Sequence, residues 1–253
     1  MTIDLFISLS LFALAVGSFA GVFIYRLPLM ENNKDLNLIR PRSFCPSCKR
    51  QLKISMIIPI FSFLFLRGQC GYCQEKIEPI YIVHELIHLL VMLFILSVYV
   101  SFNSSIIFIF LLFSIFYIQS ILDYRHLILS ISLNILLILM GLTINYYLNF
   151  FTSFEESMLG MVAGYISLWL INALYFLFRK KIGIGSGDFL LFSGCGAVFG
   201  VFALGPILLI GSAISLFIYA VKKQKFAQQI PLGSGIAAGA MIYYIIFIVT
   251  GLL

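Results

Sequence analysis

Long apolar runs separated by short polar stretches dominate this chain. Eight runs approach or exceed the ~17 to 20 residues that a helix needs to cross a bilayer. The pattern therefore predicts an all-α polytopic membrane protein with about eight transmembrane helices. The predicted spans are Ile3–Tyr25, Ile80–Val100, Ile106–Leu122, Leu127–Leu148, Met158–Phe178, Phe189–Leu204, Gly205–Val221 and Leu232–Leu253.

Composition agrees with this class. Of the 253 residues, 62% are hydrophobic and only 10% are charged. A soluble domain with this composition could not cover its apolar surface with polar side chains, so a soluble fold is excluded.

The basic residues predict the orientation of the chain. Lys and Arg fall in only four segments, which are 26–76, Arg125, 179–181 and 222–225. Eight spans place all four segments on one side, and the positive-inside bias makes that side cytoplasmic. We therefore expect a multi-pass membrane protein with both termini outside. The net charge of +6 is then an orientation signal, and no nucleic-acid partner is expected.

The longest polar segment, 26–79, contains two C-x2-C pairs. Cys45 and Cys48 form the first pair, and Cys70 and Cys73 form the second. In a reducing compartment two such pairs favour a tetrahedral four-cysteine zinc site, here a zinc knuckle with a structural role, over disulfides. The alternative is that the cysteines only lie in a loop.

An apolar run, Ile54–Leu66, separates the two cysteine pairs. As a helix it would reach only ~20 Å, which is too short to cross a bilayer. We expect a re-entrant or interfacial segment there.

A rival metal motif follows in the second predicted span. His84, Glu85 and His88 fit the H-E-x-x-H pattern of zinc proteases, in which two histidines on one helix face bind zinc and the glutamate activates water. No downstream motif supplies a third ligand beyond two acidic residues, Asp123 and Asp188. Polar residues at the interfacial end of a helix are the simpler interpretation.

Two acidic residues lie at the ends of predicted spans. Asp123 follows one apolar run, and Asp188 follows the glycine-rich stretch Gly183–Gly187. Taken singly, Asp123 also fits a solvated turn beside Arg125, and Asp188 also fits a helix cap. Because the two intervening spans leave the cytoplasmic face and return to it, both carboxylates end at the same depth. The sequence therefore predicts a catalytic aspartate pair.

The two aspartates differ in their expected helix positions. Asp188 opens a helix, where the positive end of the macrodipole favours a charge, whereas Asp123 closes one. On this ground alone we expect Asp188 to act as the base and Asp123 as the acid.

Several further segments carry a family resemblance. Together with Asp123 and Gly185–Phe189, they resemble the type IV prepilin peptidases, which are GxGD-type intramembrane aspartic proteases. Leu127–Ser130 and Leu190 depart from the family pattern, which bears on substrate preference or rate more than on reaction type. The family glutamate that aligns with Glu85 needs no flanking histidines. The segments are Gly17–Ala20, Ile24–Pro28, Arg42–Cys48, Leu66–Cys73 and Ile230–Gly233.

The resemblance implies an intramembrane endopeptidase that removes the leader of prepilin or pseudopilin substrates at the cytoplasmic face. It also implies N-methylation of the new amino terminus with S-adenosylmethionine, for which no binding loop is recognisable in this sequence. Residues 1–100 would form the N-terminal part, with the zinc loop at 26–79 and a candidate methyltransferase function, and 101–253 a six-span peptidase part. A transporter or assembly scaffold built from glycine-broken helices is the non-enzymatic alternative.

Overall fold

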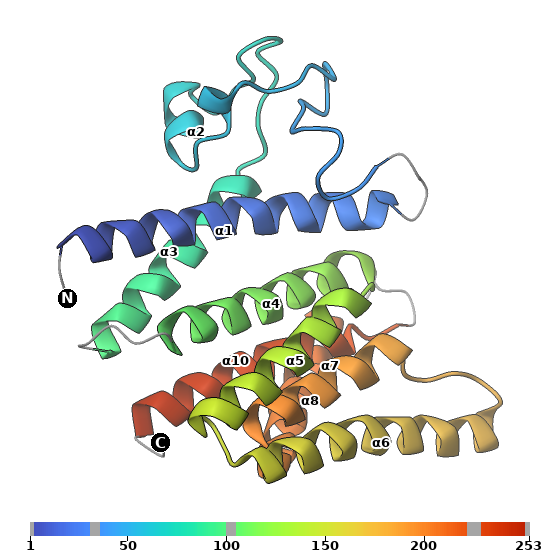
Figure 1. Cartoon of the computed structure of the whole chain (residues 1–253). Coiled ribbons are helices and arrows are strands. Elements are labelled where there is room, and N and C mark those ends of the chain that lie inside the picture. Colours follow the sequence, from blue (N-terminus) through green and yellow to red (C-terminus); the bar gives the residue numbers. More distant parts are fainter. Residues whose placement is uncertain (1–2, 31–35, 100–104, 222–228, 251–253) are drawn as a thin grey trace. The chain divides into compact units, whose positions relative to one another are not determined.

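The computed structural model describes residues 3–30, 36–99, 105–221 and 229–250, and the regular elements of these ranges are helical (Figure 1). Six apolar stretches are long enough to cross a membrane, and α7 and α10 are shorter apolar helices over their described residues. The all-α class with about eight apolar helices is thus confirmed. The elements are α1 (Ile3–Met30), η1 (Ile54–Met56), α2 (Phe61–Phe65), α3 (Ile80–Val98), α4 (Ser105–His126), α5 (Ile131–Leu148), α6 (Phe154–Arg179), α7 (Ser186–Phe199), η2 (Val201–Ala203), α8 (Leu204–Val221) and α10 (Leu232–Thr250).

Helix ends follow local chemistry. The Ser130 side chain accepts a hydrogen bond from the Leu133 N–H at the start of α5, and Ser153 does the same for Glu156 at the start of α6. Asn149 and Lys180 end these two helices in the left-handed conformation. These caps satisfy backbone groups that the helix itself leaves without partners.

The chain divides into two compact units, Met1–Phe110 and Leu111–Leu253, with the boundary inside α4. In unit 1, α1 crosses α3, and residues 36–79 form an irregular segment that carries α2 (Figure 1). The crossing is close because Gly17 lacks a side chain, and a Cβ there would lie 2.8 Å from the Glu85 Cα.

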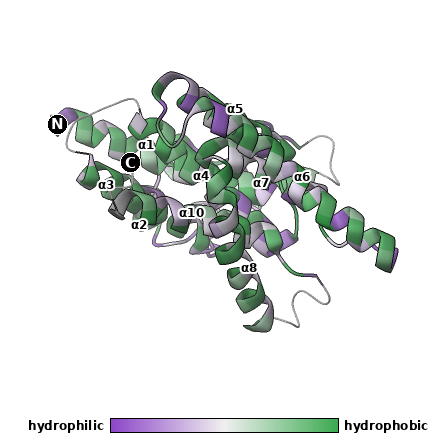
Figure 2. Ribbon diagram, turned by 90° about the horizontal axis from the view of Figure 1, so that it is seen from below, coloured by the Kyte–Doolittle hydropathy of each residue, from purple (hydrophilic) through white to green (hydrophobic). Residues whose placement is uncertain are grey.

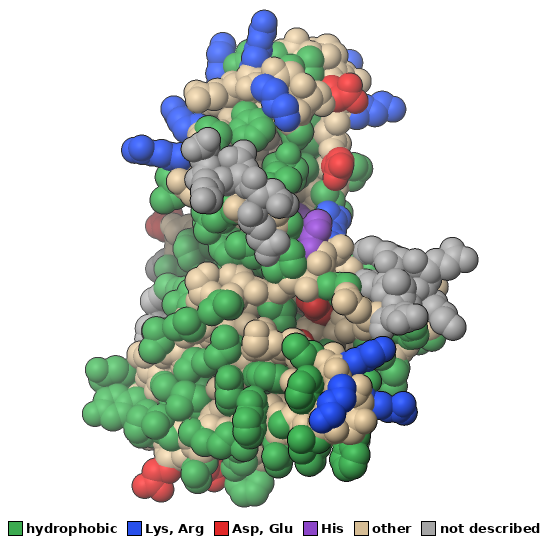
Figure 3. Space-filling view, turned by 90° about the vertical axis from the view of Figure 1, so that its right-hand side faces the viewer, with side chains coloured by type: hydrophobic (Ala, Val, Ile, Leu, Met, Phe, Trp, Pro, Cys, Tyr) green, Lys and Arg blue, Asp and Glu red, His purple; other side chains and the backbone are tan. Residues whose placement is uncertain are grey.

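The predicted segment Ile54–Leu66 contains only η1 and α2, so it contains no spanning helix. Its apolar side chains point outward, and Phe65 is 85% exposed. Lys and Arg side chains gather at the end of unit 1 that this segment forms (Figure 3). The helices are apolar along most of their length (Figure 2). This distribution suits a polar cap on membrane-embedded helices.

Unit 2 is built around α7. Every residue of α7 from Leu191 to Phe199 is buried, against α5, α6 and α10. A helix that is apolar all round belongs in the interior of a bundle. Because α7 is enclosed, it is stable at only 14 residues.

Glycine pairs allow these helices to approach each other. A Cβ on Gly196 of α7 would overlap the carbonyl of Gly160 in α6, and a Cβ on Gly235 of α10 would overlap the carbonyl of Gly211 in α8. Small residues at crossings are typical of membrane helices, because packing contacts drive their association.

Gly196→Ala is therefore expected to destabilise the protein by about 1 to 3 kcal/mol, since backbone atoms of α6 must move to admit the methyl group. The measurement is thermal unfolding in detergent. Gly205→Ala is the matched control, because a Cβ at Gly205 meets nothing within 4 Å. Equal unfolding temperatures for the two variants would contradict the close α6–α7 crossing.

Candidate active site

Asp123 lies near the end of α4 and is 6% exposed. Its Oδ2 accepts hydrogen bonds from the Ser234 backbone N–H at 2.6 Å and from the Ser234 hydroxyl at 3.0 Å. The backbone N–H of Gly233 also donates to this carboxylate. Gly233 and Ser234 belong to the first turn of α10, so the carboxylate occupies a helix N-terminus, which favours negative charge.

Ser234 is itself held in place by α4. Its single hydroxyl proton is shared between the Asp123 Oδ2 and the Ser120 carbonyl, each 3.0 Å from the Ser234 oxygen, and the Ser120 hydroxyl donates to the Ser234 carbonyl at 3.3 Å. These reciprocal bonds fix the first turn of α10 beside the carboxylate of Asp123.

Asp188 lies in the first turn of α7. Its Oδ2 accepts a hydrogen bond from the Gly185 N–H at 3.2 Å, which caps the helix. Its other oxygen, Oδ1, is buried and has no hydrogen-bond partner among the described residues. An ionised oxygen in this position would be costly, whereas a protonated one can donate to a substrate.

Gly233 connects the two aspartates. Its N–H donates to Asp123, and a Cβ at this position would lie 3.1 Å from the Asp188 Oδ1. The two carboxylates are close enough for the charge of Asp123 to act on Asp188. The structure therefore brings together the two acids on which the sequence prediction rests.

A buried polar network anchors the glycine loop. The Gln119 side chain bonds both the N–H and the carbonyl of Ser130, and it donates to the Asn134 side chain. Asn134 in turn donates to the Gly187 carbonyl at 3.1 Å. Sequence analysis missed Gln119 and Asn134, although amides inside apolar runs are costly in a membrane unless they are bonded.

Leu129, one of the residues that depart from the family pattern, packs over the glycines beside the aspartates. A Cβ on Gly187 would lie 2.9 Å from the Leu129 Cβ, and one on Gly233 would lie 2.8 Å from its Cδ1. Glycine at both positions lets the side chain settle against the site.

The surroundings of the two aspartates favour the opposite assignment of acid and base from the one that the sequence alone predicts. That prediction used the helix that contains each aspartate and omitted α10, whose N-terminus faces Asp123. Asp123 carries the donors that stabilise a charge, and Asp188 has the oxygen without one. The geometry favours an ionised Asp123 and a protonated Asp188.

The four cysteines of unit 1 form a cluster whose sulfur atoms all lie within 4.8 Å of one another. The Cys45 and Cys73 sulfurs are 3.8 Å apart. A tetrahedral site with metal–sulfur bonds of about 2.3 Å places its sulfurs about 3.8 Å apart. The cluster therefore has the dimensions of a four-thiolate metal site.

The two cysteine pairs have the same backbone form. The Cys45 N–H donates to the Arg50 carbonyl and the Cys70 N–H to the Glu75 carbonyl, and each closes a short knuckle. Burial raises the pKa of Cys45, but the backbone N–H groups of Cys48 and Ser47 together with the Cys70 and Cys48 side chains lower it to about 7. The Glu75 N–H lowers the pKa of Cys73, but burial and the other three cysteine side chains raise it to about 11, so the thiols of the cluster differ in acidity.

The H-E-x-x-H motif does not form a second metal group. Within the described part of the chain, the cysteines are the only cluster of possible metal ligands. The Glu85 Oε2 accepts a hydrogen bond from the Ile60 N–H at 2.6 Å, and the His88 Nδ1 lies 2.7 Å from the His84 carbonyl. The metalloprotease alternative is therefore not favoured.

These features define a class, a helical membrane protein with a buried and a half-buried aspartate paired in one unit and a four-cysteine cluster in the other. The bacterial peptidase A24 N-terminal domain matches residues 11–100, and the type IV leader peptidase family matches residues 106–221. The chain belongs to the type IV leader peptidase family.

Curated relatives cover almost the whole chain, and each is named a prepilin leader peptidase/N-methyltransferase. The Legionella pneumophila protein is 34% identical over 94% of this chain and 90% of its own length. The Neisseria gonorrhoeae protein is 32% identical over 91% of this chain and 87% of its own length. The Klebsiella pneumoniae protein is 36% identical over 81% of this chain and 89% of its own length. No solved structure gives a significant match.

Proposed function

We propose that this protein is an aspartic endopeptidase that removes the leader of prepilin or pseudopilin substrates and then N-methylates the new amino terminus. The observation that carries the peptidase proposal is the juxtaposition of Asp123 and Asp188 across Gly233. The printed names of the relatives support both activities. The basic segments support cleavage on the cytoplasmic side of the bacterial inner membrane with both termini outside.

In the proposed mechanism the two carboxylates share one proton, because two charges this close cannot both persist. Ionised Asp123, held by the first turn of α10, takes a proton from the attacking water. Protonated Asp188 donates from Oδ1 to the scissile carbonyl. Burial within unit 2 strengthens both interactions by excluding bulk water.

Ser234 is then a positioning residue for Asp123. Ser234→Ala removes one hydrogen bond to a charged group, so we expect kcat/KM for leader cleavage to fall about 10- to 100-fold. Because the ionised carboxylate loses a stabilising donor, the acid side of the pH profile should move to higher pH. Ser193→Ala, at a buried serine of α7 that bonds Met161, is the control. If the pH profile of Ser234→Ala were the same as that of the wild type, Ser234 would have only a structural role.

The proposed metal is a structural zinc ion held by Cys45, Cys48, Cys70 and Cys73, which agrees with the donor set and the sulfur spacing. When bound, it would close residues 36–79 into one folded segment. We assign the methyltransferase function to residues 1–100, with the loop at 26–79, and the peptidase function to residues 101–253.

S-adenosylmethionine supplies an electrophilic methyl group when bound. The pocket of unit 1 has a volume of about 200 Å³. Sites that enclose a drug-sized ligand are larger, roughly 300 to 1,000 Å³. A pocket of this volume would enclose only part of the cofactor.

The test is incubation of the purified protein with a leader-bearing precursor in detergent, with and without S-adenosylmethionine. Mass spectrometry should find a shortened product in both samples and a singly methylated one only with the cofactor. An intact precursor after incubation with the wild-type protein would overturn the proposal.

A further inference from the structure

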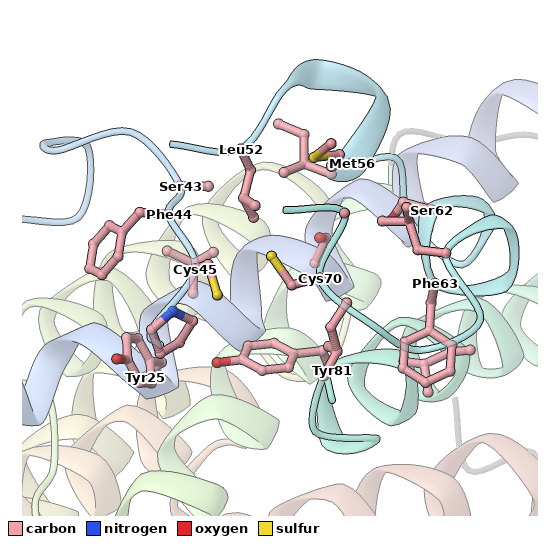
Figure 4. Close-up of a pocket in the computed structure, with 18 of the residues that line it drawn as sticks. Tyr25, Ser43, Phe44, Cys45, Leu52, Met56, Ser62, Phe63, Cys70 and Tyr81 are labelled. Atoms are coloured by element: carbon pink, nitrogen blue, oxygen red, sulfur yellow. The ribbon is translucent and has the colours of Figure 1, made fainter. Parts of the chain in front are cut away.

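Unit 1 contains a pocket that the peptidase mechanism does not use. It lies between α1, α3 and the segment 36–79, with Tyr25 and Tyr81 on the helix side and Leu52 and Met56 on the loop side (Figure 4). Its lining is mainly apolar and aromatic, with few polar groups. This is the usual composition of a site for a small molecule or a side chain.

The pocket has a carboxylate in its wall. Glu85 is 7% exposed, accepts a hydrogen bond from the Ile60 N–H and is also bonded by the Ser18 side chain. These neutral donors are its hydrogen-bond partners among the described residues, and none of the Lys or Arg side chains described there pairs with it. A buried carboxylate without a cationic partner is costly, and a bound cation would offset that cost.

The other charged lining residue does not neutralise Glu85. The Arg26 Nη1 donates to the backbone carbonyls of Asn37 and Leu38 at 2.9 and 3.4 Å, and its guanidinium stacks on Phe44. Arg26 is therefore bonded to the segment that follows α1. The pocket also borders Cys45 and Cys70.

Size and lining restrict the ligand further. A volume of about 200 Å³ matches a single large side chain with its backbone amine more closely than a whole nucleoside cofactor. The rings of Tyr25, Phe44, Phe63 and Tyr81 suit an apolar or aromatic group. Aromatic faces also attract a nearby cation.

We propose that this pocket binds the free α-ammonium group and the large apolar first side chain of the cleaved peptide, with Glu85 as the partner of the ammonium. The inference rests on the proposed N-methylation, for which this amine is the methyl acceptor. It gives the N-terminal unit a peptide-binding site separate from Asp123 and Asp188.

The experiment measures peptide binding to the full-length protein in detergent by isothermal titration calorimetry. The probe is a short synthetic peptide that begins with phenylalanine and has a free amino terminus, compared with its N-acetylated twin and with a twin that begins with serine. Glu85→Gln is the test variant, because glutamine keeps an acceptor for Ile60 and Ser18 but removes the charge. Glu78→Gln, an exposed acid of the same unit, is the matched control.

We expect the wild type and Glu78→Gln to bind the free-amine phenylalanine peptide at least about tenfold more tightly than either twin. Glu85→Gln should lose that preference while keeping its metal content and unfolding temperature. Equal binding of free and acetylated peptides by the wild type would overturn the proposal. So would an unchanged preference in Glu85→Gln.

A second arm titrates S-adenosylmethionine alone, which separates the two possible cations. We expect the wild type and Glu85→Gln to bind S-adenosylmethionine with the same affinity. If Glu85→Gln bound S-adenosylmethionine more weakly than the wild type, the partner of Glu85 would be the sulfonium group of the cofactor and not the peptide ammonium. Because the peptide probe needs no cleavage, its binding does not depend on Asp123 or Asp188. If the precursor were not cleaved, the proposed function would be refuted, but the measured binding of the free-amine peptide would still stand.

Discussion

Replacing either Asp123 or Asp188 with asparagine is expected to lower kcat/KM for leader cleavage by about 10³-fold or more, with the protein still folded. Each acid–base group typically raises the reaction rate by roughly 10²- to 10⁴-fold, and two carboxylates that share one proton act as a unit. Asparagine at 123 still accepts from Ser234 but takes no proton from water. Asparagine at 188 cannot supply a proton from the buried position of Oδ1.

Cleavage of a leader-bearing precursor, followed by gel or mass spectrometry, measures this effect. Asp4→Asn is the like-for-like control, because Asp4 is an exposed residue at the start of α1. Unfolding temperatures show whether each variant is folded. A folded Asp123→Asn or Asp188→Asn variant that processes the precursor at the wild-type rate would refute the aspartate dyad.

Replacement of a buried cysteine is expected to have the second largest effect. Cys45→Ser or Cys70→Ser should reduce bound zinc from about one ion per chain to almost none, because three thiolates hold a structural site far less well than four. The binding of structural zinc contributes roughly 10 to 16 kcal/mol to the folding free energy of zinc-finger peptides at neutral pH. Residues 36–79 contain little other regular structure, so their folding should depend on the metal.

Elemental analysis of the purified protein gives the zinc content, and limited proteolysis reports the order of the loop. The loss of zinc should expose residues 36–79 to protease and abolish binding of the free-amine peptide, whose pocket includes Cys45 and Cys70. Cys195→Ala is the control, because Cys195 is buried in α7 of unit 2. A full zinc content in Cys45→Ser would contradict the four-cysteine site.

Much of the fold could be predicted because the signals are local. Each membrane helix must satisfy its own backbone hydrogen bonds, so length and hydropathy alone identify it. Even so, the predicted span Phe189–Leu204 is α7 together with η2, and α7 itself ends at Phe199. Because other helices enclose α7, it is stable although it is shorter than a helix that crosses a bilayer.

The cysteine cluster was also predictable, since two C-x2-C pairs have little use in a reducing compartment other than metal binding. The H-E-x-x-H pattern was equally visible, but it is not part of a metal cluster in the described chain. A spacing of four residues places His84 and His88 on one face of a helix. It does not supply the further ligands, which must come from elsewhere in the fold.

By itself, the sequence determined the membrane class, the helices, the cysteine cluster and the two acids of the candidate site. Tertiary structure alone decided that the N-terminus of α10 faces Asp123, through a serine 111 residues away, and that Asp188 keeps an oxygen without a donor. It also decided that Glu85 lines a pocket. The physical reason is that charge and proton position depend on donors brought from distant segments, whereas helix formation depends on neighbours along the chain.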